Sequence, residues 1–193
     1  MRASYACGQD VDARGTHGLA CKKSAGRHLR HALLNDVVWR AMQRAEVPST
    51  KEPNNLCRDG GRPDGVTMVP WARGRCMAWD VTDPETLAPS HVQATVASAG
   101  AAASSSEALK SAKYADLAAT HTFIPLAFET LGSWGELARH FVAELGRRTL
   151  AVTGDSRETA FLRQRISVAI QRGNALAYAG TLGPSQGLLP RMN

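Results

Sequence analysis

Residues 62–82 read Arg-Pro-Asp-Gly-Val-Thr-Met-Val-Pro-Trp-Ala-Arg-Gly-Arg-Cys-Met-Ala-Trp-Asp-Val-Thr. Val66–Trp71 is rich in β-branched and aromatic residues, and Cys76–Val81 is a mostly apolar run. Between them, Ala72–Gly74 has the composition of a turn. This pattern predicts a β-hairpin, because two strand-like runs are separated by a short glycine-containing segment.

Two aspartates lie in this hairpin, Asp64 at the start of the first strand and Asp80 near the end of the second. Carboxylates from neighbouring strands can hold a divalent metal that activates water against a phosphodiester. Asp80 lies between Trp79 and Val81, where a solitary charge is costly unless it is paired or binds a metal. The simpler alternative is that Pro63-Asp64 merely begins a strand and that Asp80 caps or turns the chain.

The rest of the chain predicts alternating helices and strands. Before the hairpin, residues 26–46 read as a helix with an apolar stripe of Leu34, Val37, Val38, Ala41 and Ala45. The other expected elements are a short strand at 50–56, a loop at 83–106, a helix at 107–119, a strand at 122–130 and helices at 134–152 and 157–175. Pro125 predicts that the last strand lies at a sheet edge or contains a bulge.

This order predicts an α/β fold in which a mixed central sheet is flanked by helices. Three segments follow from the composition: a cysteine-containing segment at 1–25, the α/β domain at 26–180 and a glycine- and proline-rich tail at 181–193, expected to be frayed.

The helix after the hairpin carries Lys110 and Lys113. On a helical wheel Lys113 lies between Leu109 and Leu117, so we expect it to point towards the sheet and the two aspartates. A lysine there could polarise the attacking water or stabilise the scissile phosphate. Lys110 is the alternative for this role.

Three further acids could contribute to the site. Glu52 precedes the sheet, Glu107 begins the second helix and Asp36 lies on the first helix. For each of them, a solvated surface carboxylate is expected in preference to a metal ligand.

Residues 15–176 resemble the restriction-endonuclease-like, or PD-(D/E)xK, domain found downstream of reverse transcriptases in non-LTR retrotransposons of invertebrates. The matching segments are 26–36 (Gly-Arg-His…Arg-His…Asn-Asp), 62–65 (Arg-Pro-Asp-Gly), 79–82 (Trp-Asp-Val-Thr), 113–115 (Lys-Tyr-Ala), 123–132 and 164–174. Thr82 stands two residues after Asp80, where the general PD-(D/E)xK motif has a lysine, but it also occurs in the retroelement relatives.

The resemblance implies a restriction-endonuclease-like core and a Mg²⁺-dependent endodeoxyribonuclease that nicks target DNA. If the matching positions have the same roles as in that family, Asp64 and Asp80 would be the metal ligands and Lys113 the relocated catalytic lysine. Such domains lie at the end of long polyproteins, so the chain would be a fragment or a relic of one. The alternatives are a catalytically inactive module that binds DNA or RNA and an inert remnant of a retroelement.

The N-terminal segment contains Cys7, His17 and Cys21 in a C-x9-H-x3-C arrangement. Cysteine and histidine at this density suit tetrahedral zinc, and His28 could complete the set. In the relatives, a cysteine just before Cys7 would give a zinc knuckle, whereas here Ser4 and Tyr5 stand in that region. The segment is therefore either a degenerate zinc knuckle or an unfolded arm with free thiols.

The net charge of +6 favours a polyanionic partner, and we expect DNA, with the RNA of the element as a second candidate. The residues expected to contact phosphates are Arg27, Arg30, His31, Arg62 and Lys110, with Arg147, Arg148, Arg163, Arg165 and Arg172 on the last helices. No run approaches the roughly 20 apolar residues of a membrane span. The absence of a signal-peptide pattern predicts an intracellular location, nuclear if the gene is expressed.

Overall fold

The computed structural model describes residues 4–5, 7–11, 15–21, 23–24, 26–57 and 60–181. Its helices are α1 (His17–Ala20), α2 (Gly26–Arg44), α3 (Val92–Ala97), α4 (Ala101–Lys113), α5 (Glu136–Thr153) and α6 (Glu158–Ala179), with the 3-10 turn η1 (Leu117–Ala119). Its strands are β1 (Ser49–Lys51), β2 (Gly65–Thr67), β3 (Met77–Thr82) and β4 (Thr122–Ala127). None of the described helices is both long enough and apolar enough to cross a membrane.

The strands form one four-stranded mixed sheet in the order β1-β2-β3-β4. The β1–β2 and β2–β3 pairs are antiparallel, whereas β3 and β4 are parallel and are joined by a crossover through α3 and α4. The predicted α/β class with a mixed sheet flanked by helices is thus confirmed. Pro125 lies on β4, at the edge of the sheet, where its missing N–H removes no ladder hydrogen bond from a further strand.

The predicted hairpin is the β2–β3 pair, and its turn is held by the hydrogen bond that the N–H of Arg75 donates to the carbonyl of Ala72, at 2.9 Å. The two residues between them, Arg73 and Gly74, have φ of 49° and 72°. Two successive positive φ values are typical of the type I′ turn, whose twist suits a tight hairpin. The observed turn, 72–75, is therefore one residue longer than the predicted turn, 72–74.

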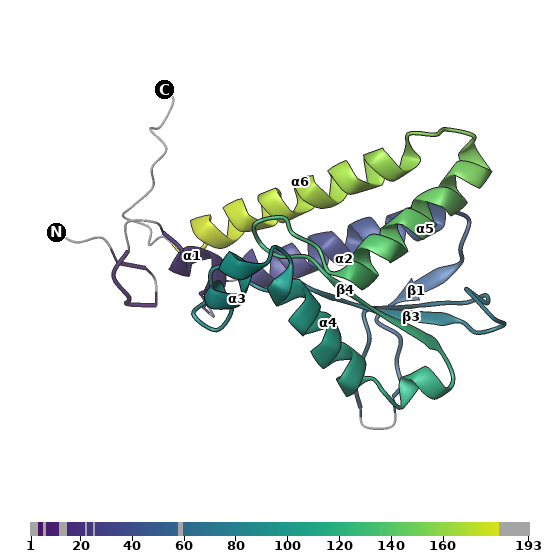
Figure 1. Cartoon of the computed structure of the whole chain (residues 1–193), viewed down its shortest axis with the longest axis horizontal. Coiled ribbons are helices and arrows are strands. Elements are labelled where there is room, and N and C mark those ends of the chain that lie inside the picture. Colours follow the sequence, from purple (N-terminus) through teal and green to yellow (C-terminus); the bar gives the residue numbers. More distant parts are fainter. Residues whose placement is uncertain are drawn as a thin grey trace.

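Side chains along β3 alternate between the two faces of the sheet, and each face packs against different helices. Met77, Trp79 and Val81 face the larger core, which packs against α2, α5 and α6. Ala78 instead faces a small cluster with Tyr114 on the other side, under α4. Figure 1 shows the same arrangement, with α2, α5 and α6 on one side of the sheet and α4 on the other.

Two glycines let α2 and α6 cross closely. A Cβ on Gly26 would lie 2.2 Å from the Cα of Ala177, and one on Gly173 would lie 2.4 Å from Cγ of Arg30. Both approaches are closer than real Cβ contacts, so a larger residue would force the helices apart. Arg44 and Glu158 form an ion pair at the opposite end, so the two helices run antiparallel.

Arg30 is buried at this crossing and is only 1% exposed. Its Nε donates to Asp83 Oδ2 at 2.5 Å, and its Nη1 donates to Asn174 Oδ1 at 3.2 Å and to the carbonyl of Leu19 at 3.4 Å. Asn174 in turn donates to the carbonyl of Thr130 at 2.7 Å. One guanidinium thus joins α1, α2, α6 and the segment after β3. The expectation that Arg30 contacts phosphates is wrong, because the side chain is inside the protein.

Glu107 is also buried, at 5% exposure, so its expected place on the surface is wrong. Its carboxylate accepts from the backbone N–H groups of Leu137 and Ala138, at 3.2 and 2.9 Å. These N–H groups belong to the first turn of α5, where helical donors lack intrahelical partners and a negative charge is favourable. Glu107 is therefore a capping residue supplied by another helix.

The expected loop at 83–106 is wrong in part, because α3 lies within it and α4 begins at Ala101 instead of residue 107. The first strand is shorter than predicted, with three residues at Ser49–Lys51. In the predicted tail, Thr181 is buried and its hydroxyl donates to the carbonyl of Tyr178. The remainder of that tail, 182–193, lies outside the described residues.

We predict that Arg30→Ala lowers the free energy of unfolding by about 3–5 kcal/mol, because it leaves the mostly buried Asp83 carboxylate without its cation. Arg27→Ala, an exposed change on the same helix, should alter it by less than about 0.5 kcal/mol. Urea unfolding followed by circular dichroism measures both. Equal, small losses in the two variants would contradict the structural role of Arg30.

Candidate functional site

Asp64 and Asp80 meet at one end of the β2–β3 pair. Gly65 is the register partner of Trp79, and continuing this antiparallel register by one position places Asp64 opposite Asp80. Opposite residues of an antiparallel pair lie about 5 Å apart at their Cα atoms. The structure therefore places the two aspartates that the sequence singled out beside each other on neighbouring strands.

Asp64 is held mainly through one oxygen, Oδ2, which accepts from the backbone N–H of Val81 at 2.6 Å. The same oxygen lies 3.0 Å from Nε2 of His31. From the next turn of α2, Asn35 donates its Nδ2 to the carbonyl of Asp64 at 3.3 Å and accepts at Oδ1 from Trp79 Nε1 at 2.9 Å. Both the side chain and the backbone of Asp64 are thus fixed by α2.

His31 was expected to contact phosphates, but its ring is engaged inside the site. Its Nε2 lies near two acceptors, Asp64 Oδ2 and the carbonyl of Val81 at 3.2 Å, so this nitrogen carries a proton in the described arrangement. The hydrogen bond to Asp64 raises the pKa of His31 above its ordinary value of 6.5. An imidazolium here compensates the negative charge of Asp64.

Asp80 projects from β3 towards α4 and is almost completely buried. Its Oδ1 lies 2.6 Å from Nζ of Lys110, although this contact lacks hydrogen-bond geometry. A buried carboxylate oxygen without a well-directed donor is costly, and the charge of Lys110 offsets part of this cost. Lys110, the alternative to Lys113 in the sequence argument, is the lysine that reaches the aspartates.

Lys113 does not point towards the sheet, so the orientation expected from the helical wheel is wrong. It is exposed, and its Nζ lies 3.3 Å from the hydroxyl of Tyr114 and 4.7 Å from the centre of that ring. Tyr114 donates its hydroxyl to the carbonyl of Arg62 at 3.1 Å, two residues before Asp64. Burial, followed by the charge of Asp80, raises the pKa of Tyr114, so the phenol remains a donor.

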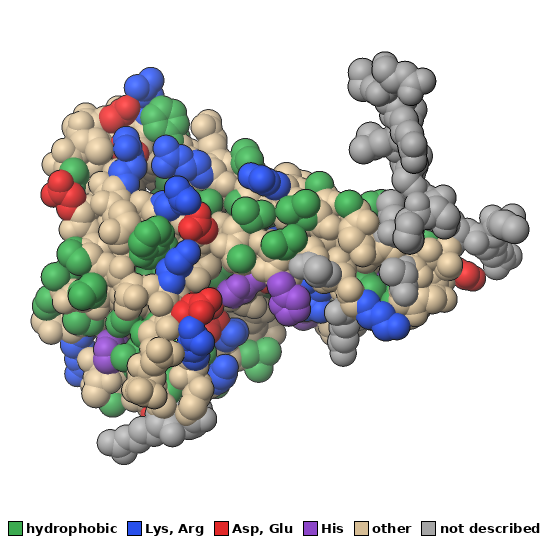
Figure 2. Space-filling model, turned by 180° about the vertical axis from the view of Figure 1, so that it is seen from behind, with side chains coloured by type: hydrophobic (Ala, Val, Ile, Leu, Met, Phe, Trp, Pro, Cys, Tyr) green, Lys and Arg blue, Asp and Glu red, His purple; other side chains and the backbone are tan. Residues whose placement is uncertain are grey.

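A pocket of about 410 Å³ lies beside this site. Its lining comprises His31, Ala32 and Asn35 of α2, Lys51 of β1, and Glu52 and Arg62. Arg62 and Glu52 form an exposed ion pair at 2.5 Å, so Glu52 is a surface carboxylate, as expected. Figure 2 shows the face of the molecule on which histidine, basic and acidic side chains gather.

The remaining expected phosphate contacts have different surroundings. Arg27 is exposed on the first turn of α2, as are Arg163, Arg165 and Arg172 on α6. Arg147 forms an ion pair with Glu144, and Arg148 stacks on the Trp71 ring with its Cζ 3.7 Å from the ring centre. Among the five expected contacts outside the last helices (Arg27, Arg30, His31, Arg62 and Lys110), Arg27 and Arg62 are therefore the two exposed residues.

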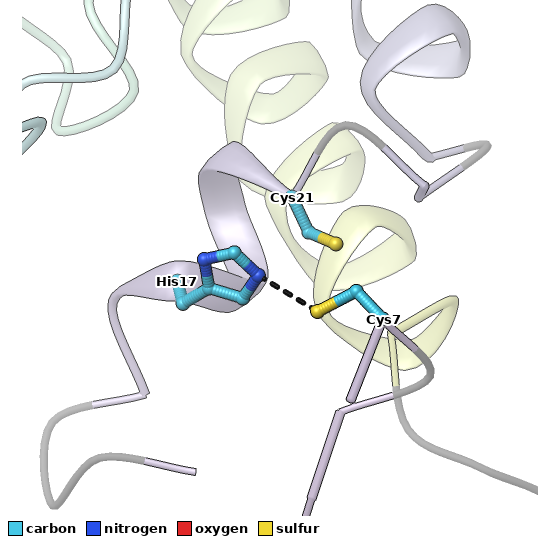
Figure 3. A group of neighbouring side chains, drawn as sticks. All are labelled: Cys7, His17 and Cys21. Atoms are coloured by element: carbon cyan, nitrogen blue, oxygen red, sulfur yellow. Dashed lines mark hydrogen bonds between the residues drawn. The ribbon is translucent and has the colours of Figure 1, made fainter. Parts of the chain in front are cut away.

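Cys7, His17 and Cys21 form a second site in the N-terminal segment (Figure 3). Their ligand atoms all lie within 4.8 Å of one another, and Cys7 Sγ lies 3.1 Å from His17 Nε2. Ligand atoms around a tetrahedral zinc ion are separated by roughly 3.5–3.8 Å, given the usual zinc–ligand bond lengths. The group could bind a metal ion. Among the described residues it is the single group of three or more such ligands.

The local fold explains this convergence. A turn at Gly8, with φ of 89°, brings Ser4 against Asp10 as an isolated bridge, and α1 presents His17 one turn before Cys21. A hydrogen bond from the backbone N–H of Gln9 lowers the pKa of Cys7, which favours the thiolate that metals require. His28 is exposed on α2 and is not a member of the group, so the expectation that it completes the set is wrong.

The metal-ligand segment packs on the end of α6. A Cβ on Gly15 or Gly18 would lie 2.5 or 2.7 Å from the side chain of Tyr178, so glycine permits this close approach. Ser24 donates its hydroxyl to the carbonyl of Ala177 at 2.8 Å. The alternative of an unfolded arm is therefore wrong for the described residues of this segment.

A scan against protein-family models finds no family that matches the chain, and a search of curated proteins finds no match. The geometry of the two sites and the sequence motifs are therefore the basis on which a function is proposed.

The contacts of His31 and Asn35 with Asp64 in the carboxylate site were not predicted from the sequence. His31 and Asn35 stand four residues apart on α2, so they share one face of the helix. That spacing was visible in the sequence. Their common partner, Asp64, lies at least 29 residues further along the chain and is brought to them only by the packing of α2 on the sheet.

We predict that Asp64→Asn lowers the pKa of His31, because the hydrogen-bonded negative charge that raises it is lost. A raised folded-state pKa contributes stability that is present below pH 6.5 and lost as the pH rises through the folded pKa. The stability difference between wild type and variant should therefore be larger at about pH 5.5 than at about pH 8.5. NMR titration of His31 and urea unfolding at both pH values measure these effects.

His31→Gln is the matched control, since it removes the titrating group and should remove this pH dependence. An unchanged His31 pKa in Asp64→Asn would contradict the coupling.

Proposed function

We propose that this chain is a metal-dependent endonuclease with a restriction-endonuclease-like core that hydrolyses phosphodiester bonds in DNA. The observation that carries the proposal is the convergence of Asp64 and Asp80 at the end of the central hairpin, with Lys110 in contact with Asp80. The order of helix, hairpin, helix and parallel strand is the arrangement that the sequence resemblance implies.

The donor set suits a hard divalent cation such as Mg²⁺, which prefers carboxylate oxygens. The hydrogen bonds to Asp64 use Oδ2, so Oδ1 is the oxygen that would bind the ion. Asp80 would supply the second ligand, through an Oδ1 that has an ion-pair partner but no directed hydrogen bond. When bound, Mg²⁺ supplies Lewis acidity and lowers the pKa of a coordinated water.

The residues of the chain would perform the remaining tasks. Hydrolysis adds water across one P–O bond and yields an alcohol and a phosphate monoester. Val81, His31 and Asn35 fix Asp64 in one orientation, and this reduces the reorganisation needed when substrate binds. Lys110 would neutralise the negative charge that develops on the phosphate, and its position beside Asp80 suits this role.

Origin in a retroelement remains part of the proposal and is supported by the motifs alone. They comprise the Arg-Pro-Asp-Gly segment, the Trp-Asp-Val-Thr segment and the Lys-Tyr pair. Under this proposal target DNA is the substrate, RNA of the element is a second ligand, and an expressed chain would act in the nucleus. Arg62 lines the pocket beside the carboxylate site and would contact the phosphate backbone, together with the exposed Arg27 on the first turn of α2.

For the N-terminal cluster we propose zinc as the metal. Two thiolates and one imidazole are ligands that zinc favours over magnesium or calcium. The three residues would hold the ion structurally and keep the segment folded against α6.

We predict that the purified chain nicks supercoiled plasmid when Mg²⁺ is present and not in EDTA. Asp80→Asn and Asp64→Asn should reduce nicking to background, because they remove anionic ligands while keeping the side-chain shape. Lys110→Met should slow nicking by about 10²–10³-fold. Lys113→Met is the matched control on the same helix and should change the rate by less than about twofold. Gel quantification of open-circular DNA measures each rate.

Nicking that persists in both aspartate variants would reject the assignment, and a larger effect of Lys113→Met than of Lys110→Met would reverse the two lysine roles. The alternative is a module that binds nucleic acid without cutting it, and Thr82 in the usual lysine position favours it. Salt-sensitive DNA binding without Mg²⁺-dependent nicking, in protein shown to be folded, would establish that alternative.

We predict that the chain binds one Zn²⁺ and that the Co²⁺-substituted protein shows cobalt–thiolate charge-transfer absorption. Cys7→Ser and Cys21→Ser should each weaken the metal binding and abolish part of this absorption, since each removes one thiolate ligand. Cys76→Ser lies outside the cluster and serves as the control. Metal content and absorption that are unchanged in all three variants would contradict the site.

A further inference from the structure

A groove of about 580 Å³ runs along the outer surface between α2 and α6. Apolar side chains form its floor, with Leu33 and Val37 from α2 and Phe161 and Val168 from α6. Val168 is 65% exposed, although it lies in the middle of a well-packed helix. On the face that Figure 2 shows, hydrophobic and basic side chains lie close together along these helices.

Positive charge lines both walls of this groove. Arg40 belongs to the α2 wall, and Arg165 and Arg172 belong to the α6 wall. The acid in the groove, Asp36, is paired with two cations, Arg40 at 2.6 Å and Lys51 at 3.2 Å, so these three groups together keep a net positive charge on the α2 side. An apolar floor between cationic walls is complementary to a ligand that has an apolar side with acidic groups along both of its edges.

We propose that the α2–α6 groove docks an amphipathic, acidic helix from a partner protein. The groove lies between two antiparallel helices, and a third helix packs at such a seam with its apolar stripe towards the floor. From Phe161 to Arg172 the α6 wall is roughly 16 Å long at 1.5 Å per residue, which is about three helical turns of the partner. Glutamates or aspartates beside the apolar stripe would pair with Arg165 and Arg172.

Other occupants fit less well. A second copy of this chain carries a net charge of +6, and residues 182–193 contain one arginine and no acid, so neither complements the cationic walls. Nucleic acid would match the charge but would leave the apolar floor without an apolar partner. A helix covers that floor, and removal of apolar surface from water is the larger source of affinity.

The groove is separate from the proposed nuclease site. Leu33 and Val37 lie on a different face of α2 from His31 and Asn35, which contact Asp64. The docking proposal therefore does not rest on the nuclease proposal, and Asp80→Asn should bind the partner helix as the wild type does.

The test uses the full chain and a fluorescein-labelled peptide of about 16 residues, with leucines at helical spacing and glutamates on both flanks. A peptide of the same composition with the leucines scattered is the matched control. Fluorescence anisotropy at low and moderate salt measures both affinities. We expect the patterned peptide to bind at least about tenfold more tightly than the scattered one.

Two protein variants locate the binding. Val168→Glu places a charge in the floor, and Arg165→Glu reverses one wall; both side chains are exposed, so thermal unfolding should be almost unchanged. Each should weaken binding of the patterned peptide by about tenfold or more, whereas Arg163→Glu, on the same helix outside the groove, should not.

Equal binding of the two peptides, no binding of either, or equal effects of the three variants would overturn the proposal. A duplex oligonucleotide that competes with the peptide and binds less tightly to Arg165→Glu but not to Val168→Glu would identify the surface as a nucleic-acid contact, and this too would overturn it.

Discussion

Burial of the Arg30 guanidinium is the constraint on which the arrangement of the other elements depends. An arginine inside a protein is tolerated only when its charge is paired and its donors have acceptors, and here these come from Asp83, Asn174 and the carbonyl of Leu19. The acceptors lie on three separate parts of the chain, so the guanidinium fixes α1, α6 and the end of β3 relative to α2. Gly173 permits the approach, because a side chain there would occupy the space of the Arg30 stem.

That fixed position of α2 has a direct consequence for the carboxylates. His31 follows Arg30 immediately, and Asn35 lies one turn further on, so both are directed at the sheet and reach Asp64. Asp80 projects to the other side of the same sheet and is compensated by Lys110 of α4. The pair is therefore held from both layers of the fold. A displacement of either layer would separate a carboxylate from the group that compensates its charge.

The hairpin, the central strand and the long helices were predictable from the sequence, because apolar periodicity and turn residues are local signals. The choice between Lys110 and Lys113 was not. The helical wheel was oriented by Leu109, which is 70% exposed, whereas the buried residues of α4 are Ala102, Ala103 and Glu107. Glu107 is buried because it caps α5, a partner about 30 residues away. No local pattern shows that a glutamate will orient a helix in this way.

The N-terminal segment belongs to this same network. Leu19, whose carbonyl accepts from Arg30, lies in α1 between His17 and Cys21. The backbone that brings these two side chains to Cys7 therefore also solvates the guanidinium that positions α2. If the three ligands were spread apart, α1 would move, and Arg30 would lose one of its three acceptors. The cysteine–histidine cluster and the aspartate pair occupy different parts of the molecule, yet both depend on one buried charge.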